Sequence, residues 1–272
     1  MTSRRSESSI NPSTVNRRDL RAVAVWCACL VCIWGGLAHA QWPALEGRWA
    51  LIQVFPLLAE IPLAGEVEQT SHVALFTEIS QDDATLVMND TYCFTHITTA
   101  TPIAGTEIPQ AFMESLTAQP RYGSLASSDG VLRLEMETYT EVRGAVLSDP
   151  DADPLPTDPE DPRIIDQDGD GSPGMSVHVS VLGLLEGQIH VVQRVRYRMS
   201  GYVVDENTMI GTLEWSDERT VVGATNPVFL TRSASRPHPD PARHRFVMIR
   251  VDDSWTCETL RDRLAELLEI GS

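Results

Sequence analysis

The alternation of hydrophobic and polar positions predicts that this chain is built mainly from β-strands. The pattern is clearest over 131–142, where the even-numbered positions from Leu132 to Val142 would form one face and charged residues the other. After residue 174, short alternating segments follow one another with brief turns between them, which is typical of an antiparallel sheet. Strands are expected at 49–55, 67–79, 85–97, 131–142, 175–181, 189–197, 202–204, 209–215, 220–222 and 245–251.

Helical spacing is found at the C-terminus. Leucines at 260, 264, 267 and 268 would form one stripe after Thr256, a suitable N-cap, and Gly271 follows the predicted end. The segment 98–130 is rich in Pro, Thr, Ala and Ser and suggests only a short helix at 110–116. We therefore predict an all-β fold, with an antiparallel sheet forming a barrel or a sandwich and a C-terminal amphipathic helix.

The segment 148–174 has no apolar period. Its prolines disfavour both helix and central strand, and it is crowded with acidic residues. A structureless insertion of this length is usually either functional or disordered. We predict that it is a long acidic loop inserted into a single β-rich domain spanning 41–272.

Alternating carboxylates stand near the end of this loop. Asp166, Asp168 and Asp170 have the spacing at which side chains can turn toward one cation, and Gly171 supplies the sharp turn that follows. The run resembles the D-x-D-x-D-G calcium loop shared by EF-hands, dockerins and thrombospondin type 3 repeats. The resemblance implies a structural Ca²⁺, with the backbone carbonyl of Ser172 as a further ligand.

The loop departs from a complete EF-hand. Val177 takes the position of the bidentate Glu, Pro173 replaces an aliphatic residue, and no helical pattern precedes the loop. The missing ligands are expected elsewhere, with Asp161, Asp158 and Glu160 the nearest candidates and Asp161 the one we include. The alternative is an acidic surface turn that binds nothing specific.

Charge limits the classes of partner. The chain carries 38 acidic residues against 21 basic ones, all of them arginine, for a formal net charge of −17. This balance argues against nucleic acid and anionic membranes, since both need a basic footprint. It favours cations and basic partners, and it leaves open a protein or a small-molecule ligand.

Residues 1–40 have the organisation of a secretory signal. An arginine-bearing segment ends at Arg21, an apolar core follows, and Ala38 and Ala40 fit a cleavage site that would make Gln41 the new N-terminus. The core is shorter than a membrane span of about twenty residues, which makes an uncleaved anchor the weaker interpretation. We expect a periplasmic or extracellular protein with no integral membrane segment after cleavage.

Only Cys93 and Cys257 remain after such cleavage. In an oxidising compartment the two are expected to form a disulfide, which would stabilise the fold by roughly 3–5 kcal/mol. A metal pair or a catalytic thiol is the alternative, but no His-rich spacing flanks either cysteine.

For the polar residues on the predicted strands, a structural role is a better interpretation than a ligand site. His178 and His190 share parity on adjacent strands and could meet at a zinc site, but a solvated polar face is the better interpretation. Arg194, Arg196 and Arg198 line one strand face. They are expected to pair with the outward glutamates of 131–142 rather than to bind an anionic ligand.

No constellation in the sequence specifies a reaction. The function we predict is an exported, non-catalytic binding or structural protein stabilised by calcium. Gly47-Arg48-Trp49 resembles the lipocalin signature, in which the Trp plugs the closed end of a barrel, and implies as an alternative a barrel carrying a small apolar ligand. A secreted hydrolase is the second alternative, although no G-x-S-x-G elbow is present.

Overall fold

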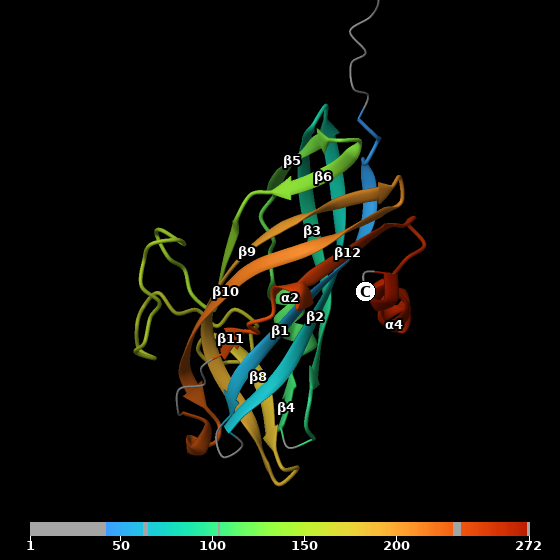
Figure 1. Ribbon diagram of the computed structural model, residues 1–272. Helices are drawn as coiled ribbons and strands as arrows, with labels where there is room; N and C mark the ends of the chain where they lie inside the picture. The colour runs from blue at the N-terminus through green and yellow to red at the C-terminus, as the bar shows by residue number, and fades with distance from the viewer. Residues whose placement is uncertain (1–41, 62–64, 103, 231–234, 271–272) are drawn as a thin grey trace, which may run out of the picture. The chain divides into compact units, whose positions relative to one another are not determined.

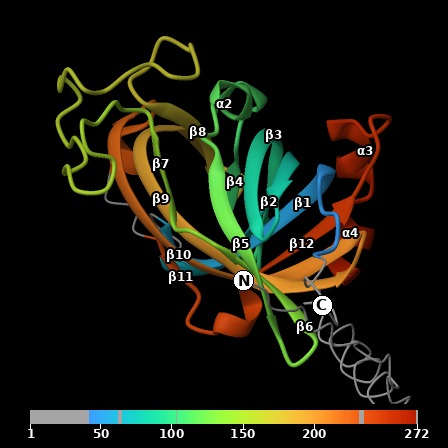
Figure 2. The same cartoon turned by 90° about the horizontal axis from the view of Figure 1, so that it is seen from above.

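A 12-stranded sheet curls round on itself and dominates the structure (Figures 1 and 2). This computed structural model describes residues 42–61, 65–102, 104–230 and 235–270. The predicted signal segment 1–40 and Gly271 lie outside the described residues. The strands are β1 (Gly47–Ile61), β2 (Gly65–Asp82), β3 (Thr85–Thr99), β4 (Ala104–Glu107), β5 (Arg121–Ser128), β6 (Val131–Met136), β7 (Tyr139–Arg143), β8 (Met175–Val181), β9 (Leu185–Asp205), β10 (Thr208–Ala224), β11 (Ser235–Pro237) and β12 (Arg245–Arg250).

The strand pairings close a ring at one end of the sheet and leave the other end partly open. Strands β10, β12, β1, β2, β3, β5, β6 and β9 are neighbours in that order, and β9 pairs back with β10. Farther along β9, β7 and then β8 take the place of β6, and β4 continues the sheet beyond β8. The pairings between these strands are antiparallel, which confirms the predicted fold class.

Strands β9 and β10 are much longer than their sequence pattern predicted. They span 21 and 17 residues, so the turns expected at 198–201 and 216–219 do not exist. Gly201 lies opposite Gly211, and a Cβ on either would come within 2.7 Å of the Phe246 ring. These glycines therefore allow the close approach of an aromatic ring inside a continuous hairpin.

The strand predicted at 131–142 is two strands with different faces. β6 pairs with β9 as Glu135↔Ser200, whereas β7 pairs as Tyr139↔Tyr197, so the chain gains one residue between the two registers. An extra residue in one strand reverses the side-chain alternation. Tyr139 and Glu141 consequently face inward, and the predicted even-numbered face is wrong beyond residue 136.

Strands β4 and β5 also escaped prediction, because each lies in the Pro- and Ser-rich segment 98–130. The short helix expected there is confirmed as α2 (Gln110–Ser115). Two 3-10 turns, η1 (Pro227–Leu230) and η2 (Pro241–Arg243), complete the connections.

Two helices cover the outside of the sheet at the C-terminus. Thr256 caps α3 (Cys257–Asp262) by accepting a hydrogen bond from Thr259 N, and α4 (Leu264–Ile270) follows after a break at Arg263. Their leucines pack on an apolar outer patch of β1, β2, β3 and β12. The predicted Cys93–Cys257 disulfide joins α3 to β3, with its Cα atoms 5.2 Å apart. Within the described ranges, no helix is long and apolar enough to cross a membrane.

The interior of the closed end is packed with apolar side chains. Trp49 is fully buried there, and its indole N–H donates to the carbonyl of Leu45 at 2.9 Å. The Arg250 guanidinium lies 4.6 Å from the Trp49 ring centre and donates to the carbonyls of Ala44 and Glu46. This cation–π contact and these hydrogen bonds hold the segment before β1 against β12, the last strand.

Candidate functional site

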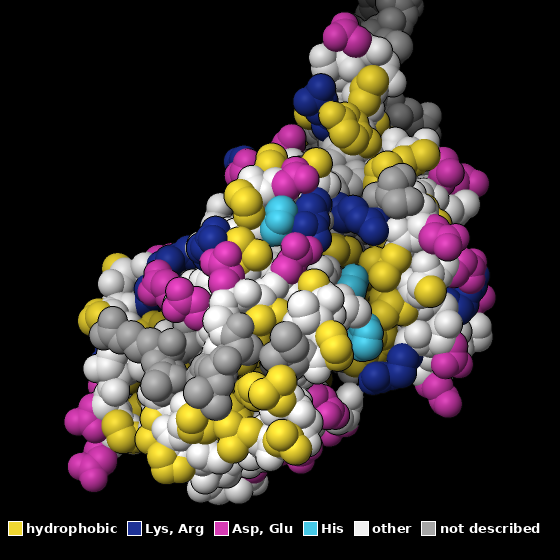
Figure 3. All heavy atoms as spheres, turned by 60° about the horizontal axis from the view of Figure 1, so that its bottom comes forward, with side chains coloured by type: hydrophobic (Ala, Val, Ile, Leu, Met, Phe, Trp, Pro, Cys, Tyr) yellow, Lys and Arg dark blue, Asp and Glu magenta, His cyan; other side chains and the backbone are white. Residues whose placement is uncertain are grey.

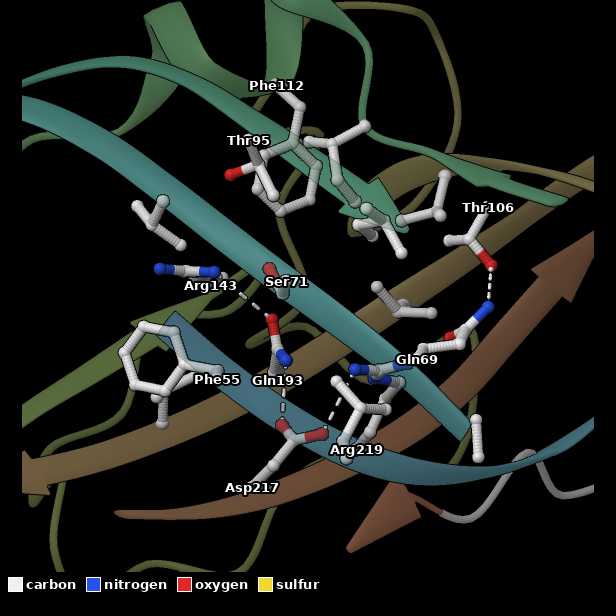
Figure 4. A pocket seen from close by; sticks show the side chains of 18 of the residues that line it. Phe55, Gln69, Ser71, Thr95, Thr106, Phe112, Arg143, Gln193, Asp217 and Arg219 are labelled. Carbon is white, nitrogen blue, oxygen red and sulfur yellow. Dashed lines mark hydrogen bonds and ion pairs between the residues drawn. The ribbon is translucent and has the colours of Figure 1, made fainter. Parts of the chain in front are cut away.

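A cavity of about 160 Å³ lies inside the barrel at the partly open end (Figure 4). Strands β1 to β4 form one part of its wall and β7 to β10 form another, while α2 and η1 contribute one aromatic side chain each. Most of the wall is apolar, with the aromatic residues Phe55, Phe112, Trp215 and Phe229 among branched aliphatic side chains. Such a surface suits the apolar body of a small molecule.

A chain of hydrogen-bonded polar side chains crosses this apolar wall (Figure 4). Arg219 donates from Nη2 to Asp217 Oδ2 at 3.0 Å, and Gln193 donates from Nε2 to Asp217 Oδ1 at 2.7 Å. Arg143 then donates to Gln193 Oε1 at 3.4 Å. β10 carries the first two residues, β9 carries Gln193 and β7 carries Arg143, so adjacent strands place the groups in a row.

The row continues away from Gln193. Arg143 donates from Nε to Glu141 Oε2 at 2.9 Å, and the Tyr92 hydroxyl on β3 donates to the same carboxylate at 3.3 Å. We call the set Tyr92, Glu141, Arg143, Gln193, Asp217 and Arg219 the polar belt. It contains two ion pairs, Arg143–Glu141 and Arg219–Asp217.

Burial sets the protonation of the belt. Loss of solvent, reinforced by the Glu141 charge, raises the pKa of Tyr92 well above its ordinary value, so the phenol stays neutral and donates. For Arg143, burial opposes the charged form, but the Glu141 carboxylate together with Tyr92 and Asp217 outweighs it, and the net pKa is raised. The belt therefore keeps fixed donors across the physiological pH range.

A third buried ion pair lies next to the cavity, toward the closed end. Arg121 on β5 donates from Nε and Nη2 to the two carboxylate oxygens of Asp90 at 2.6 and 2.8 Å. Its Cζ lies 5.8 Å from the ring centre of Tyr197, which lines the cavity. Burial raises the pKa of Tyr197.

The acidic loop brings together the three alternating aspartates that the sequence singled out. One carboxylate oxygen from each of Asp166, Asp168 and Asp170 lies within 4.8 Å of the others. Asp166 accepts hydrogen bonds from the backbone N–H groups of Asp170 and Gly171, which curl the loop round it. One oxygen of Asp168 accepts from Ser176 N, and the other is buried without a partner in the described structure. Oxygen groups at this spacing match the ligand preference of calcium.

The other two candidate ligands lie differently. Asp161 accepts hydrogen bonds from the backbone and the guanidinium of Arg163, which lower its pKa, and it is not a member of the three-carboxylate group. The backbone N–H of Ser172 donates to Asp170 Oδ1 at 2.8 Å. These contacts place Ser172 beside the group and occupy Asp161 with an internal ion pair.

A serine and a histidine connect the acidic loop to the sheet. Ser176 Oγ lies 2.5 Å from Asp170 Oδ2 and 2.8 Å from His190 Nδ1, and the bond to the serine lowers the pKa of Asp170. In a hydrolytic triad the imidazole lies between the other two groups, whereas here the hydroxyl does. Ser176 is only 2% exposed. The arrangement therefore suits an anchor rather than a nucleophile.

The two histidines considered for zinc are engaged separately. The register pairs His190 with Ser176 and His178 with Gln188. His178 Nε2 lies 2.9 Å from the Gln188 amide nitrogen. The strand pairing thus gives each imidazole its own polar neighbour. His178 is exposed, as a solvated polar face requires, whereas His190 is only 7% exposed, so that interpretation is wrong for His190.

The arginines of β9 pair with acids, but not with those expected. Arg194 and Arg196 both bind Glu218, and Arg198 binds Glu214, so these acids lie on β10, while Arg196 also pairs with Asp151 of the acidic loop. β10 accompanies β9 along most of its length, whereas β6 and β7 meet it only in short stretches. On the face seen in Figure 3, arginine and acidic side chains likewise lie side by side.

The same arginines hold the start of the acidic loop on the sheet. Arg194 donates to the carbonyl of Asp153, and Arg196 donates to the carbonyl of Asp151. Thr140 on β7 donates to the Asp151 carboxylate at 2.6 Å. The loop is therefore attached near both its ends.

The polar belt was missed by sequence reasoning, although some of its members left a signal. Gln193 falls between Val191 and Val195 on the inward face of one strand, and a polar residue on an apolar face is informative. Asp217 and Arg219 fell in a predicted turn, which hid the same signal. Glu141 and Arg143 were hidden by the reversed alternation after β6.

Comparison with known proteins adds nothing about the cavity or the acidic loop. The chemistry of these two sites is therefore argued from the distances and burial of the chain's own residues. No protein-family model, no curated protein and no solved structure matches this chain.

Proposed function

We propose that the protein binds a small, mainly apolar molecule inside its barrel. The cavity of about 160 Å³ carries this proposal, because its wall is apolar with a few placed polar groups. An engineered protein cavity of about 150 Å³ is large enough to hold benzene. The expected ligand therefore has the size of one or two small rings.

The closed end supports a container rather than a channel. The ring of paired strands and the apolar packing round Trp49 fill that end, which leaves the cavity to the other end. The lipocalin resemblance of Gly47-Arg48-Trp49 implies the same role for this tryptophan. A one-ended barrel is suited to holding a ligand away from water.

Calorimetric titration with indane tests the binding function. Val195 lines the cavity on β9, and Val204 lies on the same strand with 56% exposure. We expect Val195→Phe to fill the cavity and weaken indane binding at least about tenfold, with Val204→Phe as the matched control that binds normally. Absence of binding to the wild-type protein, or equal binding by both variants, would contradict the proposal.

We further propose that the acidic loop holds a structural calcium ion and that the chain is exported and non-catalytic. The clustered carboxylates and the unpartnered Asp168 oxygen support the ion, since a cation would relieve both. The Asp166/Asp168/Asp170→Asn variant should lose calcium binding and the accompanying rise in melting temperature. An Asp82/Asp129/Asp253→Asn variant, with the same charge change at exposed positions, should keep both.

Two further measurements test the proposed export. The disulfide supports an oxidising compartment. N-terminal sequencing of the secreted protein should begin at Gln41, and alkylation without reduction should label neither Cys93 nor Cys257. A protein that begins at Met1, or that labels at both cysteines, would exclude this part of the proposal.

A further inference from the structure

We propose, resting on the ligand-binding function above, that the ligand is an uncharged molecule with one hydrogen-bond-accepting oxygen, such as a ketone or ester carbonyl. The Arg219 end of the polar belt would hold that oxygen. The apolar remainder of the ligand would fill the cavity.

The belt has more donors than acceptors at Arg219. A guanidinium carries five N–H groups. Arg219 donates from Nη2 to Asp217, while its Nε is buried without a partner in the described residues. Both oxygens of Asp217 are already occupied, one by Gln193 and the other by Arg219 and the Ser235 hydroxyl at 2.6 Å. A ligand that meets this surface must therefore bring an acceptor.

The guanidinium is also the accessible member of its ion pair. The Arg219 side chain is 25% exposed and borders the cavity, whereas that of Asp217 is 3% exposed. Figure 4 shows Arg219 and Arg143 joined through Asp217 and Gln193. A ligand oxygen can thus approach the Arg219 guanidinium without competing for the carboxylate.

The charges of the belt favour a neutral ligand. Arg143 is paired with Glu141 and Arg219 with Asp217, so the guanidinium charges are already balanced. An anionic ligand would bring a net charge into a poorly solvated site, which is costly without a new counter-ion. A cationic ligand would find the carboxylate oxygens taken. A carbonyl satisfies the free donors and adds no charge.

On the part of the wall formed by β1 to β4, the amide of Gln69 is already used within the protein. Gln69 on β2 donates to Thr99 at 3.3 Å and to Thr106 at 3.1 Å, so its amide is engaged within the protein. Leu57, Ile97 and Ile108 are apolar members of the same part of the wall. The ligand should therefore lie with its oxygen toward β10 and its hydrocarbon toward β1 to β4.

Three probes of one shape test this inference on the folded chain by calorimetry. We expect 1-indanone to bind at least about tenfold more tightly than indane, because indane leaves the donors unpaired. Indane-1-carboxylate should bind more weakly than the ketone. If indane binds as well as 1-indanone, or the carboxylate binds best, the polarity we infer is wrong while the binding function stands. If none of the three binds, the binding function itself fails.

Arg219→Lys assigns the effect to one residue. Lysine keeps a positive charge beside Asp217 but loses Nε and the planar fork. The advantage of 1-indanone over indane should fall below about threefold, whereas Arg198→Lys on the outer face should keep the full advantage. An unchanged advantage in Arg219→Lys would overturn the assignment.

A measurement on the wild-type protein keeps the test decisive if that variant fails to fold. In NMR spectra of protein labelled with ¹⁵N-arginine, 1-indanone should shift the Arg219 Nε–H resonance and indane should shift it much less. Equal shifts with both probes would refute a specific contact with the ligand oxygen.

Discussion

The closed end and the cavity end of this barrel share strands but not interior chemistry. Along the inward row of β10, Met209 and Leu213 give way to Asp217 and Arg219. Along β9, Met199 gives way to Gln193. The backbone pairing of β9 with β10 runs through both regions. Strand pairing thus supplies the frame, and the side chains on one inward row decide whether a region is filled or hollow.

The closed end should contribute most of the stability, and the cavity end should carry the binding function. The closed end buries large apolar side chains such as Trp49, Leu134 and Met199 in full. The cavity end leaves space unfilled and buries charges in pairs, which contribute little net stability. We therefore expect substitutions at the closed end to cost stability and substitutions at the cavity end to change binding.

The largest expected effect is at Trp49. Trp49→Ala should lower the free energy of unfolding by about 4–5 kcal/mol, because it removes a fully buried indole and leaves a void. The fraction that stays folded should bind the cavity ligand with unchanged affinity. Urea unfolding and calorimetry on the same preparation measure both. A loss below about 1 kcal/mol would mean that the closed end does not carry the stability.

A smaller loss is expected from the polar belt. Glu141→Leu leaves the Arg143 guanidinium without its carboxylate and should cost about 2–3 kcal/mol. The Glu141→Leu/Arg143→Leu double variant should recover most of that loss, since no unpaired charge remains. Urea unfolding of all three proteins tests this. A double variant that is less stable than Glu141→Leu would show that the pair itself stabilises the barrel.

A matched pair of isoleucines compares the regions directly. Ile79 is 4% exposed in the closed end and Ile189 is 5% exposed beside the cavity. Ile79→Val should cost about 1 kcal/mol and Ile189→Val about half as much, because the latter methyl group already borders empty space. Thermal unfolding of the two variants gives the difference. Equal costs would mean that the cavity wall is packed as tightly as the closed end.

The smallest expected effect lies outside both interiors, at His72 on β2. Burial lowers the pKa of His72 below its ordinary value of 6.5, with the neighbouring His96 and Arg245 charges acting in the same direction. The folded state then binds fewer protons than the unfolded state, so stability is lost as the pH falls through about 6.5. His72→Gln should reduce this loss in thermal unfolding between pH 8 and pH 5, and His178→Gln at an exposed position should not. A pH dependence unchanged by His72→Gln would place its origin elsewhere.

A group of residues close together in the sequence could be predicted, whereas a group assembled from distant strands could not. The aspartates at 166, 168 and 170 lie two residues apart, so any tight loop brings them near one another. The belt draws on β3, β7, β9 and β10, and its members meet only through strand register. A single extra residue between β6 and β7 was enough to misplace Glu141. Hydrophobic period locates strands well, but it does not fix register across a shift of this kind.

The barrel can close only after β12 has been added to the sheet. β12 lies between β1 and β10, with Trp49 paired to Arg250 and Val54 to Arg245, so β1 gains this neighbour only when the C-terminal part of the chain folds. The disulfide likewise joins residues 164 positions apart. Contacts between such distant parts of a chain make folding slow. A chain that ends before residue 245 would expose the edges of β1 and β10 to other chains, and it should aggregate rather than close.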